Sequence, residues 1–183
     1  MSKRTQTSAS RSWWATPESA VWPLLRCLEP GTVFVEPCAG DGQLVRILES
    51  HGHICAYSCD LDPRHDSVTW DDATLVIPES GEIVVTNPPF EERLLTPLLS
   101  HWLRCKSQVW LLLPSDLLMN HWFSPYAHAV WCIAPIGRVS WLGNGKGGME
   151  NSAWVSFDFA ATTPGPLLPR LKTHRPKAPR SRP

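Results

Sequence analysis

Apolar residues along positions 13–159 occur in short runs, and the spacing within these runs alternates between two types. Continuous or alternating apolar runs predict buried strands at 32–36, 53–59, 82–86, 108–113, 129–136 and 153–159. Helical spacing predicts helices over 17–28, 43–51, 91–104 and 115–122, and residues 70–77 fit neither pattern. In the third helix the expected packed face consists of Leu94, Leu95, Leu98, Leu99 and Trp102.

The order of these segments predicts the class of fold. Strands that alternate with helices are typical of an α/β domain with a mostly parallel sheet. The last two strands have no long helix between them, which predicts a terminal antiparallel pair. Thr16-Pro17-Glu18 is typical of a helix start, with Thr16 as the N-cap and Pro17 in the first turn. Ligands of such sheets bind beyond the carboxyl ends of the strands, so polar residues at those ends are the candidates for function.

Charge is distributed unevenly along the 183 residues, although the formal net charge is zero. Residues 1–12 and 160–183 hold nine of the 17 basic residues and none of the 17 acids, so the body between them has a net charge of −9. We expect a disordered basic N-terminus at 1–12, one domain at 13–162 and a disordered, proline-rich basic tail at 163–183. Basic tails suit an anionic polymer as partner, and solubilising ends are the alternative.

Six cysteines are present, and only Cys55 and Cys59 lie close together in the sequence, as C-x3-C. Neither a second cysteine pair nor a histidine pair completes a zinc pattern, so we expect no metal site. The chain starts with polar and basic residues rather than a signal peptide, and its apolar stretches are too short to cross a membrane. Reduced thiols and a cytoplasmic location without membrane contact are the expectation.

The first strand leads into a short glycine-containing loop, in the sequence VFVEPCAGDGQL at 33–44. Glu36 closes the strand, and Gly40 and Gly42 precede the next helix. Glycines allow the backbone to approach a ligand and place amide donors at a helix N-terminus. A third glycine of the dinucleotide fingerprint is missing. The acid ahead of the loop disfavours a phosphate and suits a cationic or hydroxyl-bearing ligand.

Acidic residues follow the second strand. Asp60 at its end is placed to accept hydrogen bonds from two ribose hydroxyls, and a turn acid before Pro63 is the alternative. Asp71 and Asp72 lie further along the chain. Either of them is a candidate acceptor for an adenine amino group, and either is also explained as a solvated loop acid.

The third strand ends in the sequence VVTNPPF at 84–90. Pro88 forces Asn87 into an extended backbone, and the two prolines fix the chain and remove two N–H donors. The Asn87 amide and the Pro88 carbonyl are then rigid acceptors that can hold an exocyclic amino group by its two hydrogens. Phe90 offers a ring face to a flat base. The alternative is a strand end broken by a Pro-Pro turn, with Phe90 in the core.

Taken together, these motifs resemble the S-adenosylmethionine-dependent amino-methyltransferases of the N6-adenine DNA type. Asn87-Pro88-Pro89-Phe90 resembles their catalytic [DNS]-P-P-[YFW] motif, and residues 36–42 resemble the motif that wraps the methionine part of the cofactor. Residues 13–17 resemble the aromatic-Thr-Pro segment that closes over the cofactor in the gamma order of motifs. The resemblance covers residues 13–158. It implies a Rossmann-like class I methyltransferase sandwich with a seven-stranded sheet, a terminal antiparallel hairpin and helices on both faces.

The resemblance also implies roles for single residues. The catalytic set is Asn87, Pro88, Pro89 and Phe90. Contacts to S-adenosyl-L-methionine are implied for Trp13, Trp14, Thr16, Glu36, Cys38, Gly40, Gly42, Asp60, Asp71 or Asp72, and Asn87. Trp141 and the loop at 143–148 resemble the segment placed against the target base, with Trp141 stacking and Lys146 meeting a phosphate, in addition to Phe90. The alternative for this segment is a hairpin loop with Trp141 packed in the core.

The implied activity is methyl transfer to the N6 amino group of adenine in DNA, with the target base flipped or already single-stranded. Rival interpretations are an RNA base, a protein glutamine amide, and a non-catalytic binding module. Asn at the first motif position favours adenine over cytosine N4, and the motif order and basic tails favour nucleic acid. After Phe159 this sequence continues only as a basic tail, so we expect no target-recognition domain. We therefore expect relaxed sequence specificity, as in a small solitary enzyme of phage or restriction-modification type, acting as a monomer.

Overall fold

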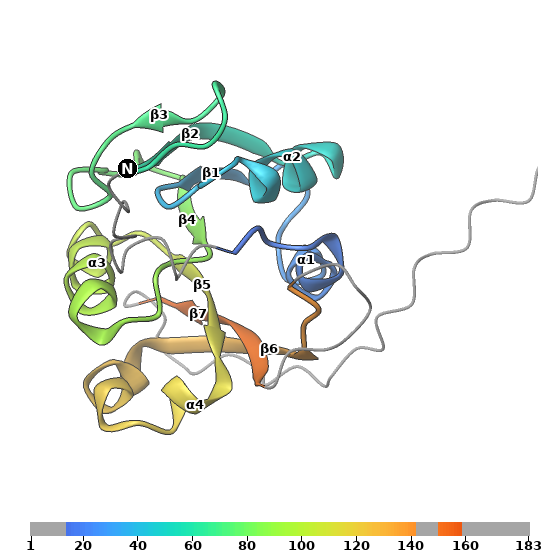
Figure 1. Ribbon diagram of the computed structural model, residues 1–183. Helices are drawn as coiled ribbons and strands as arrows, with labels where there is room; N and C mark the ends of the chain where they lie inside the picture. The colour runs from blue at the N-terminus through green and yellow to red at the C-terminus, as the bar shows by residue number, and fades with distance from the viewer. Residues whose placement is uncertain (1–13, 142–149, 159–183) are drawn as a thin grey trace, which may run out of the picture.

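A seven-stranded sheet forms the centre of the computed structural model, which describes residues 14–141 and 150–158 (Figure 1). Within these residues the strand order is β3-β2-β1-β4-β5-β7-β6. The strands are β1 (Val33–Glu36), β2 (Ile54–Asp60), β3 (Thr69–Trp70), β4 (Ile83–Thr86), β5 (Val109–Pro114), β6 (Val130–Arg138) and β7 (Asn151–Phe157). Neighbours from β3 to β5 pair in parallel, and β7 is antiparallel to both β5 and β6. The predicted mostly parallel sheet with a terminal antiparallel hairpin is confirmed.

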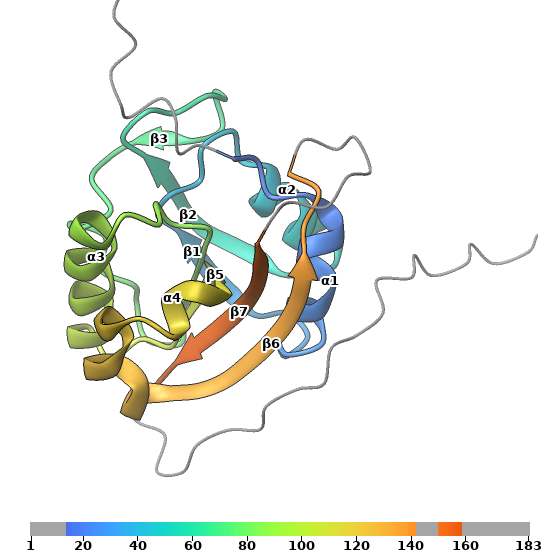
Figure 2. The ribbon, with the colours of Figure 1, turned by 60° about the horizontal axis from the view of Figure 1, so that its bottom comes forward.

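Helices cover both faces of this sheet, as Figures 1 and 2 show from two directions. One face carries α1 (Glu18–Leu25) and α2 (Gln43–Ser50). The other carries α3 (Glu92–Arg104) and the 3-10 helix η2 (His121–Ala129), and α4 (Ser115–Leu118) lies between β5 and η2 in the sequence. The helices on each face bury an apolar side against the strands, which gives the three-layer α/β arrangement.

The alternation of strand side chains explains the two apolar clusters. Phe34 and Val85 belong to the cluster that includes residues of α1 and α2. Their neighbours Val35 and Val84 belong to the cluster that includes residues of α3. Successive side chains of a strand point to opposite faces, so the continuous apolar runs of β1, β4 and β5 supply both clusters at once.

The strand order reverses at β1, which lies between β2 and β4. Because all three strands run in parallel, their carboxyl ends meet at one edge of the sheet, where ligands of such folds bind. Glu36 ends β1, Asp60 ends β2, and Asn87 follows β4. The topology therefore brings together the three strand-end residues that the sequence singles out.

Several details differ from the predictions. The prediction that Thr16 caps the first helix is wrong: Pro17 is the N-cap, the helix has no side-chain cap, and it ends at Leu25 rather than near 28. Leu94 is 41 % exposed instead of packed on the helix face. Residues 70–77 contribute to the sheet only through Trp70 at the end of β3, and residues 115–122 are divided between α4 and η2.

The described residues lack two features that would indicate a broad class of function. They contain no helix that is both long enough and apolar enough to span a bilayer. They also contain no grouping of three or more His, Cys, Asp or Glu side chains arranged to hold a metal ion. None of the six cysteines, all of which lie among the described residues, forms a disulfide bond.

Candidate active site

A cavity of about 580 Å³ lies at the carboxyl ends of β1, β2 and β4. The segments that follow the strands, the first turns of α3 and the segment before α1 form its wall. The predicted site residues that line it are Trp14, Thr16, Glu36, Cys38, Asp60, Asp72, Asn87, Pro88, Pro89 and Phe90. A volume of this size is typical of a small-molecule or cofactor site.

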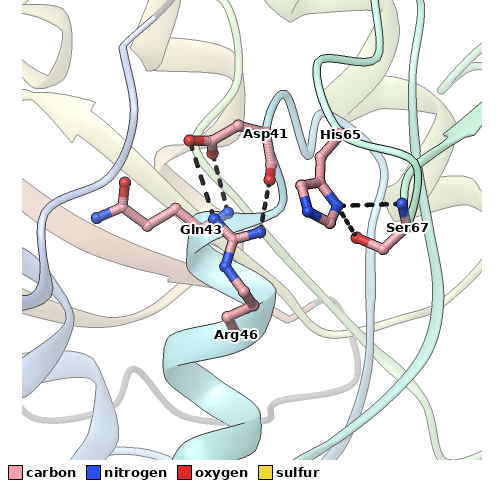
Figure 3. Close-up of polar contacts among 5 residues, drawn as sticks. All are labelled: Asp41, Gln43, Arg46, His65 and Ser67. Carbon is pink, nitrogen blue, oxygen red and sulfur yellow. Dashed lines mark hydrogen bonds and ion pairs between the residues drawn. The ribbon is translucent and has the colours of Figure 1, made fainter.

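Asp41 connects the glycine loop between β1 and α2 to the first turn of that helix (Figure 3). Gly40 and Gly42 both have positive φ angles, of 55° and 73°, which favour glycine. Asp41 Oδ1 accepts a hydrogen bond from the Gln43 amide at 2.9 Å, and Arg46 Nη1 donates to the Asp41 carbonyl at 2.7 Å. The loop is thus fixed at the start of α2 before any ligand binds.

A second loop, residues 61–68, packs against the glycine loop. A Cβ atom at Gly42 would lie 3.3 Å from Val68 Cγ2 and 3.4 Å from Ser67 Oγ. Ser67 is held in turn by His65, whose Nδ1 accepts from the Ser67 amide at 3.1 Å and lies 2.8 Å from Ser67 Oγ (Figure 3). Arg46 Nη1 would lie closer still, at 3.2 Å, so a side chain at Gly42 requires these neighbouring side chains to shift and also strains the backbone at its φ of 73°.

Asp60 connects the two loops through both of its carboxylate oxygens. Oδ2 accepts from the Gly40 amide at 2.8 Å, and Oδ1 accepts from the Asp62 amide at 2.8 Å. The same side chain therefore stabilises the turn before Pro63 and lines the cavity. Carboxylate oxygens keep further lone pairs beyond one accepted bond each, so a fixed Asp60 can also accept from ligand hydroxyls.

Asp71 and Asp72 are adjacent in sequence but have different roles in the structure. Asp71 Oδ2 accepts from the Tyr57 hydroxyl at 2.9 Å, and Asp71 is absent from the cavity wall. Asp72 lines the cavity, and its Oδ1 accepts from both the amide and the hydroxyl of Thr74 at 2.8 Å. These bonds lower the pKa of Asp72 and keep it ionised.

Glu36 is the most deeply buried acid of the cavity, with 1 % exposure. Burial raises the pKa of Glu36 to about 8, and the charge of Asp60 adds to this rise. Its Oε1 accepts a long bond of 3.4 Å from the Cys38 amide, and the nearby Thr86 side chain partly offsets the rise in pKa. Its buried Oε2 has no partner with hydrogen-bond geometry among the described residues. Buried polar atoms without partners are rare in native proteins, so Oε2 marks a place where a ligand donor, such as an ammonium group, would bind.

Asn87 has a side-chain amide held on one side only. Its Nδ2 donates to the Trp14 carbonyl and to Thr16 Oγ1, both at 3.2 Å. A carbonyl oxygen can only accept, so Trp14 requires the nitrogen of the amide to face it. Asn87 Oδ1 is buried and has no partner among the described residues. It is the second unpaired acceptor in the cavity wall.

The residues that follow Asn87 line the cavity, and one of them also packs against the hydrophobic core. Pro88 and Pro89 line the wall, and Phe90 lines it while also packing against the apolar cluster of α3. The first turns of α3 add Arg93, which the sequence analysis did not single out, and Leu94, which it expected on the packed face of the helix rather than in the site. The signal for them is their position directly after the N-P-P-F motif.

The cavity is electronegative. Six acids line it: Glu36, Asp41, Asp60, Asp62, Asp72 and Glu91. The two arginines in its wall have acidic neighbours, because Arg64 contacts Asp62 at 3.1 Å and Arg93 contacts Glu91 at 2.7 Å. Such a field favours cationic or neutral ligands over phosphates.

Some predicted site residues lie elsewhere. Trp141 packs against the apolar cluster on the α1 and α2 side and is absent from the cavity wall. Gly40 and Gly42 shape the loop behind the wall. Trp13 and Lys146 lie outside the described residues.

No protein-family model and no curated protein matches the sequence. Solved structures do match the fold. A modification subunit assigned to a type I restriction enzyme from Vibrio vulnificus YJ016 is 11 % identical, with a TM-score of 0.60 over 87 % of this chain and 46 % of that one. The chain has the Rossmann-like fold of the methyltransferases it matches. It spans less than half the length of that subunit.

Two further matches are shorter proteins. A protein from Pyrococcus horikoshii assigned as an RNA methyltransferase is 16 % identical, with a TM-score of 0.56 over 84 % of this chain and 90 % of that one. The 23S rRNA methyltransferase ErmE is 14 % identical, with a TM-score of 0.53 over 82 % of this chain and 69 % of that one. At these identities the likeness extends to the fold and not to the acceptor.

Proposed function

We propose that the protein is an S-adenosylmethionine-dependent methyltransferase that modifies an exocyclic amino nitrogen, the N6 of adenine in DNA. One observation carries the proposal: the buried, unpaired Oδ1 of Asn87 lies in the wall of the acidic cavity that holds Glu36, Asp60 and Asp72. This supports the proposal because Asn87 Oδ1 could accept a hydrogen bond from an amino group beside a site suited to a cationic cofactor.

The residues of the cavity fit this cofactor. Asp60 would accept from the ribose hydroxyls, and Asp72, which unlike Asp71 lines the cavity, would accept from the adenine amino group. Glu36 Oε2, which lacks a partner within the described residues, would accept from the ammonium of the methionine part. Bound there, S-adenosylmethionine would supply a methyl group made electrophilic by its sulfonium.

The chain itself would contribute position and electrostatics. Asn87 Oδ1 and the Pro88 carbonyl would accept the two hydrogens of the target amino group and direct its lone pair toward the methyl carbon. As positive charge develops on that nitrogen, the same two oxygens would stabilise it. Phe90 would stack on the base. A paired base cannot reach a cavity of this kind, so the target must be extruded or single-stranded.

DNA is the first acceptor we propose, because the motif order and the basic residues at both ends suit it. RNA is the second. In its favour, the fold matches RNA methyltransferases, one of them over 90 % of its own length.

The test uses labelled S-adenosylmethionine with duplex DNA, single-stranded DNA, RNA and a denatured protein extract as acceptors. The nucleic acids are digested to nucleosides and identified by mass spectrometry. We expect N6-methyladenine in DNA. Asn87→Ala should abolish transfer and keep S-adenosylhomocysteine affinity within a few-fold, whereas Asn120→Ala, an exposed asparagine outside the cavity, should keep both.

The outcomes separate the alternatives. Label in RNA alone would select the RNA acceptor, and label in protein alone would select the glutamine amide. Cofactor binding without label in any acceptor would favour a binding module. A protein that is not stabilised by S-adenosylmethionine or S-adenosylhomocysteine in thermal unfolding would contradict the proposal, since a bound ligand must raise stability.

A further inference from the structure

We infer that Thr16, together with the Trp14 carbonyl, is a positioning device that orients the catalytic amide and makes asparagine the residue required at position 87. The inference rests on the proposed function, because it assigns a role in amino-group methylation. Under this inference the segment before α1 both lines the cavity and orients the Asn87 side chain.

The contacts are directional. Asn87 Nδ2 lies 3.2 Å from the Trp14 carbonyl and 3.2 Å from Thr16 Oγ1, so each acceptor can take one of the two amide hydrogens. With both hydrogens engaged, rotation of the amide by half a turn would place Oδ1 against the Trp14 carbonyl without any donor between them. The device therefore holds Oδ1 on the opposite side, where it is buried and unpaired among the described residues.

The device is anchored at its base. Thr16 is 4 % exposed and lies two residues before α1. This helix is joined to the sheet by a buried bond of 2.7 Å from Trp154 Nε1 to the Ala20 carbonyl. Ala20, Val21 and Leu24 are also fully packed in the cluster beneath it. A side chain held by such a segment has little freedom to follow a displaced partner.

This geometry selects among the residues that the resembling motif allows at its first position, which are Asp, Asn and Ser. An aspartate would turn a carboxylate oxygen toward the Trp14 carbonyl and has no hydrogen to donate to it. A serine hydroxyl has one hydrogen for two acceptors, and its shorter side chain would leave one of them unpaired. Asparagine alone donates twice and still presents a free oxygen to the cavity.

The test compares three threonine variants. Thr16→Val removes the acceptor at nearly constant volume, Thr16→Ser keeps it, and Thr96→Val is the matched control. Thr96 Oγ1 accepts from Trp122 Nε1 at 2.7 Å outside the cavity, so its loss is the same chemical change elsewhere. We expect Thr16→Val to lower kcat by roughly 10- to 100-fold, as for a misplaced reacting group, with a much smaller change in KM. Thr16→Ser should recover most of kcat, and Thr96→Val should keep it.

A spectroscopic readout is independent of turnover. The chain has four asparagines, Asn87, Asn120, Asn144 and Asn151, so protein labelled with ¹⁵N-asparagine gives a side-chain amide spectrum that Asn87→Ala can assign. We expect the Asn87 amide protons to exchange slowly with solvent in the wild type and in Thr16→Ser. They should exchange faster and shift in Thr16→Val, and stay unchanged in Thr96→Val.

The two proposals fail in different ways. An active wild type whose Thr16→Val variant keeps kcat and an unchanged Asn87 amide signal would overturn the positioning role alone. A wild type that binds cofactor but transfers no methyl group would overturn the proposed function and the positioning role with it. If Thr16→Val does not fold, Asn87→Asp serves instead: we expect more than 100-fold loss of kcat, and near-normal turnover would refute the selection for asparagine.

Discussion

Replacing Glu36 by glutamine should stabilise the ligand-free protein at neutral pH. Burial raises the pKa of Glu36 from its ordinary value of 4.5 to about 8 in the folded protein. Between these two values the folded state keeps a proton that the unfolded state releases. The free energy of unfolding therefore falls as pH rises through this window. Glutamine has a similar shape and no proton to lose, so the variant should escape this cost.

The size of the effect follows from the two pKa values. One unit of pKa corresponds to about 1.4 kcal/mol, so the cost of burying Glu36 grows from near zero below pH 4.5 to roughly 3 kcal/mol at pH 7. Above pH 8 the residue is ionised in both states and the cost stops growing. Between pH 5 and pH 7 the stability gap between Glu36→Gln and the wild type should widen by roughly 2 to 3 kcal/mol.

Urea unfolding followed by tryptophan fluorescence at pH 5, 6, 7 and 8 measures this gap directly. Groups that titrate identically in both proteins cancel in the difference. Glu29→Gln is the control, because this acid is exposed and its removal should change the difference far less. A gap that stays constant from pH 5 to pH 7, or that narrows, would refute the reasoning that burial keeps Glu36 protonated.

Three further predictions concern the same cavity. The affinity for S-adenosylhomocysteine, measured by tryptophan quenching, should rise up to tenfold per pH unit below pH 8, because Glu36 must lose its proton to accept an ammonium; a flat profile would contradict this role. In calorimetry, Asp72→Asn should weaken that affinity roughly tenfold, about 1.4 kcal/mol, and clearly more than Asp71→Asn, whose carboxylate binds Tyr57; equal losses would count against the assignment. In urea unfolding, Gly42→Ala should cost roughly 1 to 3 kcal/mol more than Gly52→Ala, because both have positive φ but only Gly42 has neighbours within 4 Å; similar costs would show that the loops yield freely.

The part of the fold that could be predicted is the part specified by local patterns. Strands β1, β4 and β5 are short runs of apolar residues, and their side chains supply both buried clusters. Strand β3 was missed because it is two residues long and both residues are exposed, so it carries no apolar signal. Leu94 was misplaced because helical spacing shows which residues share a face, but it does not show that the cavity occupies part of that face.

The sequence predicts the candidate site residues that lie at strand ends. It does not predict those whose role depends on a contact with a residue far away in the sequence. Glu36, Asp60 and Asn87 follow from the parallel topology, since the carboxyl ends of adjacent strands must meet. Thr16 fits the local sequence pattern of a helix N-cap. In the structure its Oγ1 instead accepts a hydrogen bond from Asn87 Nδ2, 71 residues away in the sequence. The choice between Asp71 and Asp72 likewise depends on Tyr57, a contact that the positions of the two acids in the sequence do not reveal.

The charges of the domain constrain how a nucleic acid would bind. The body between the basic ends carries a net charge of −9, and six acids line the cavity. A phosphate entering this cavity would meet carboxylates at short range, whereas an uncharged base would not. The arrangement therefore favours a substrate that inserts only its base, with the amino group reaching Asn87 and the backbone kept outside. Under the proposed function, attraction to the polyanion would come from the basic residues in the segments 1–12 and 160–183. Selectivity for the base and affinity for the backbone would thus reside in different parts of the protein.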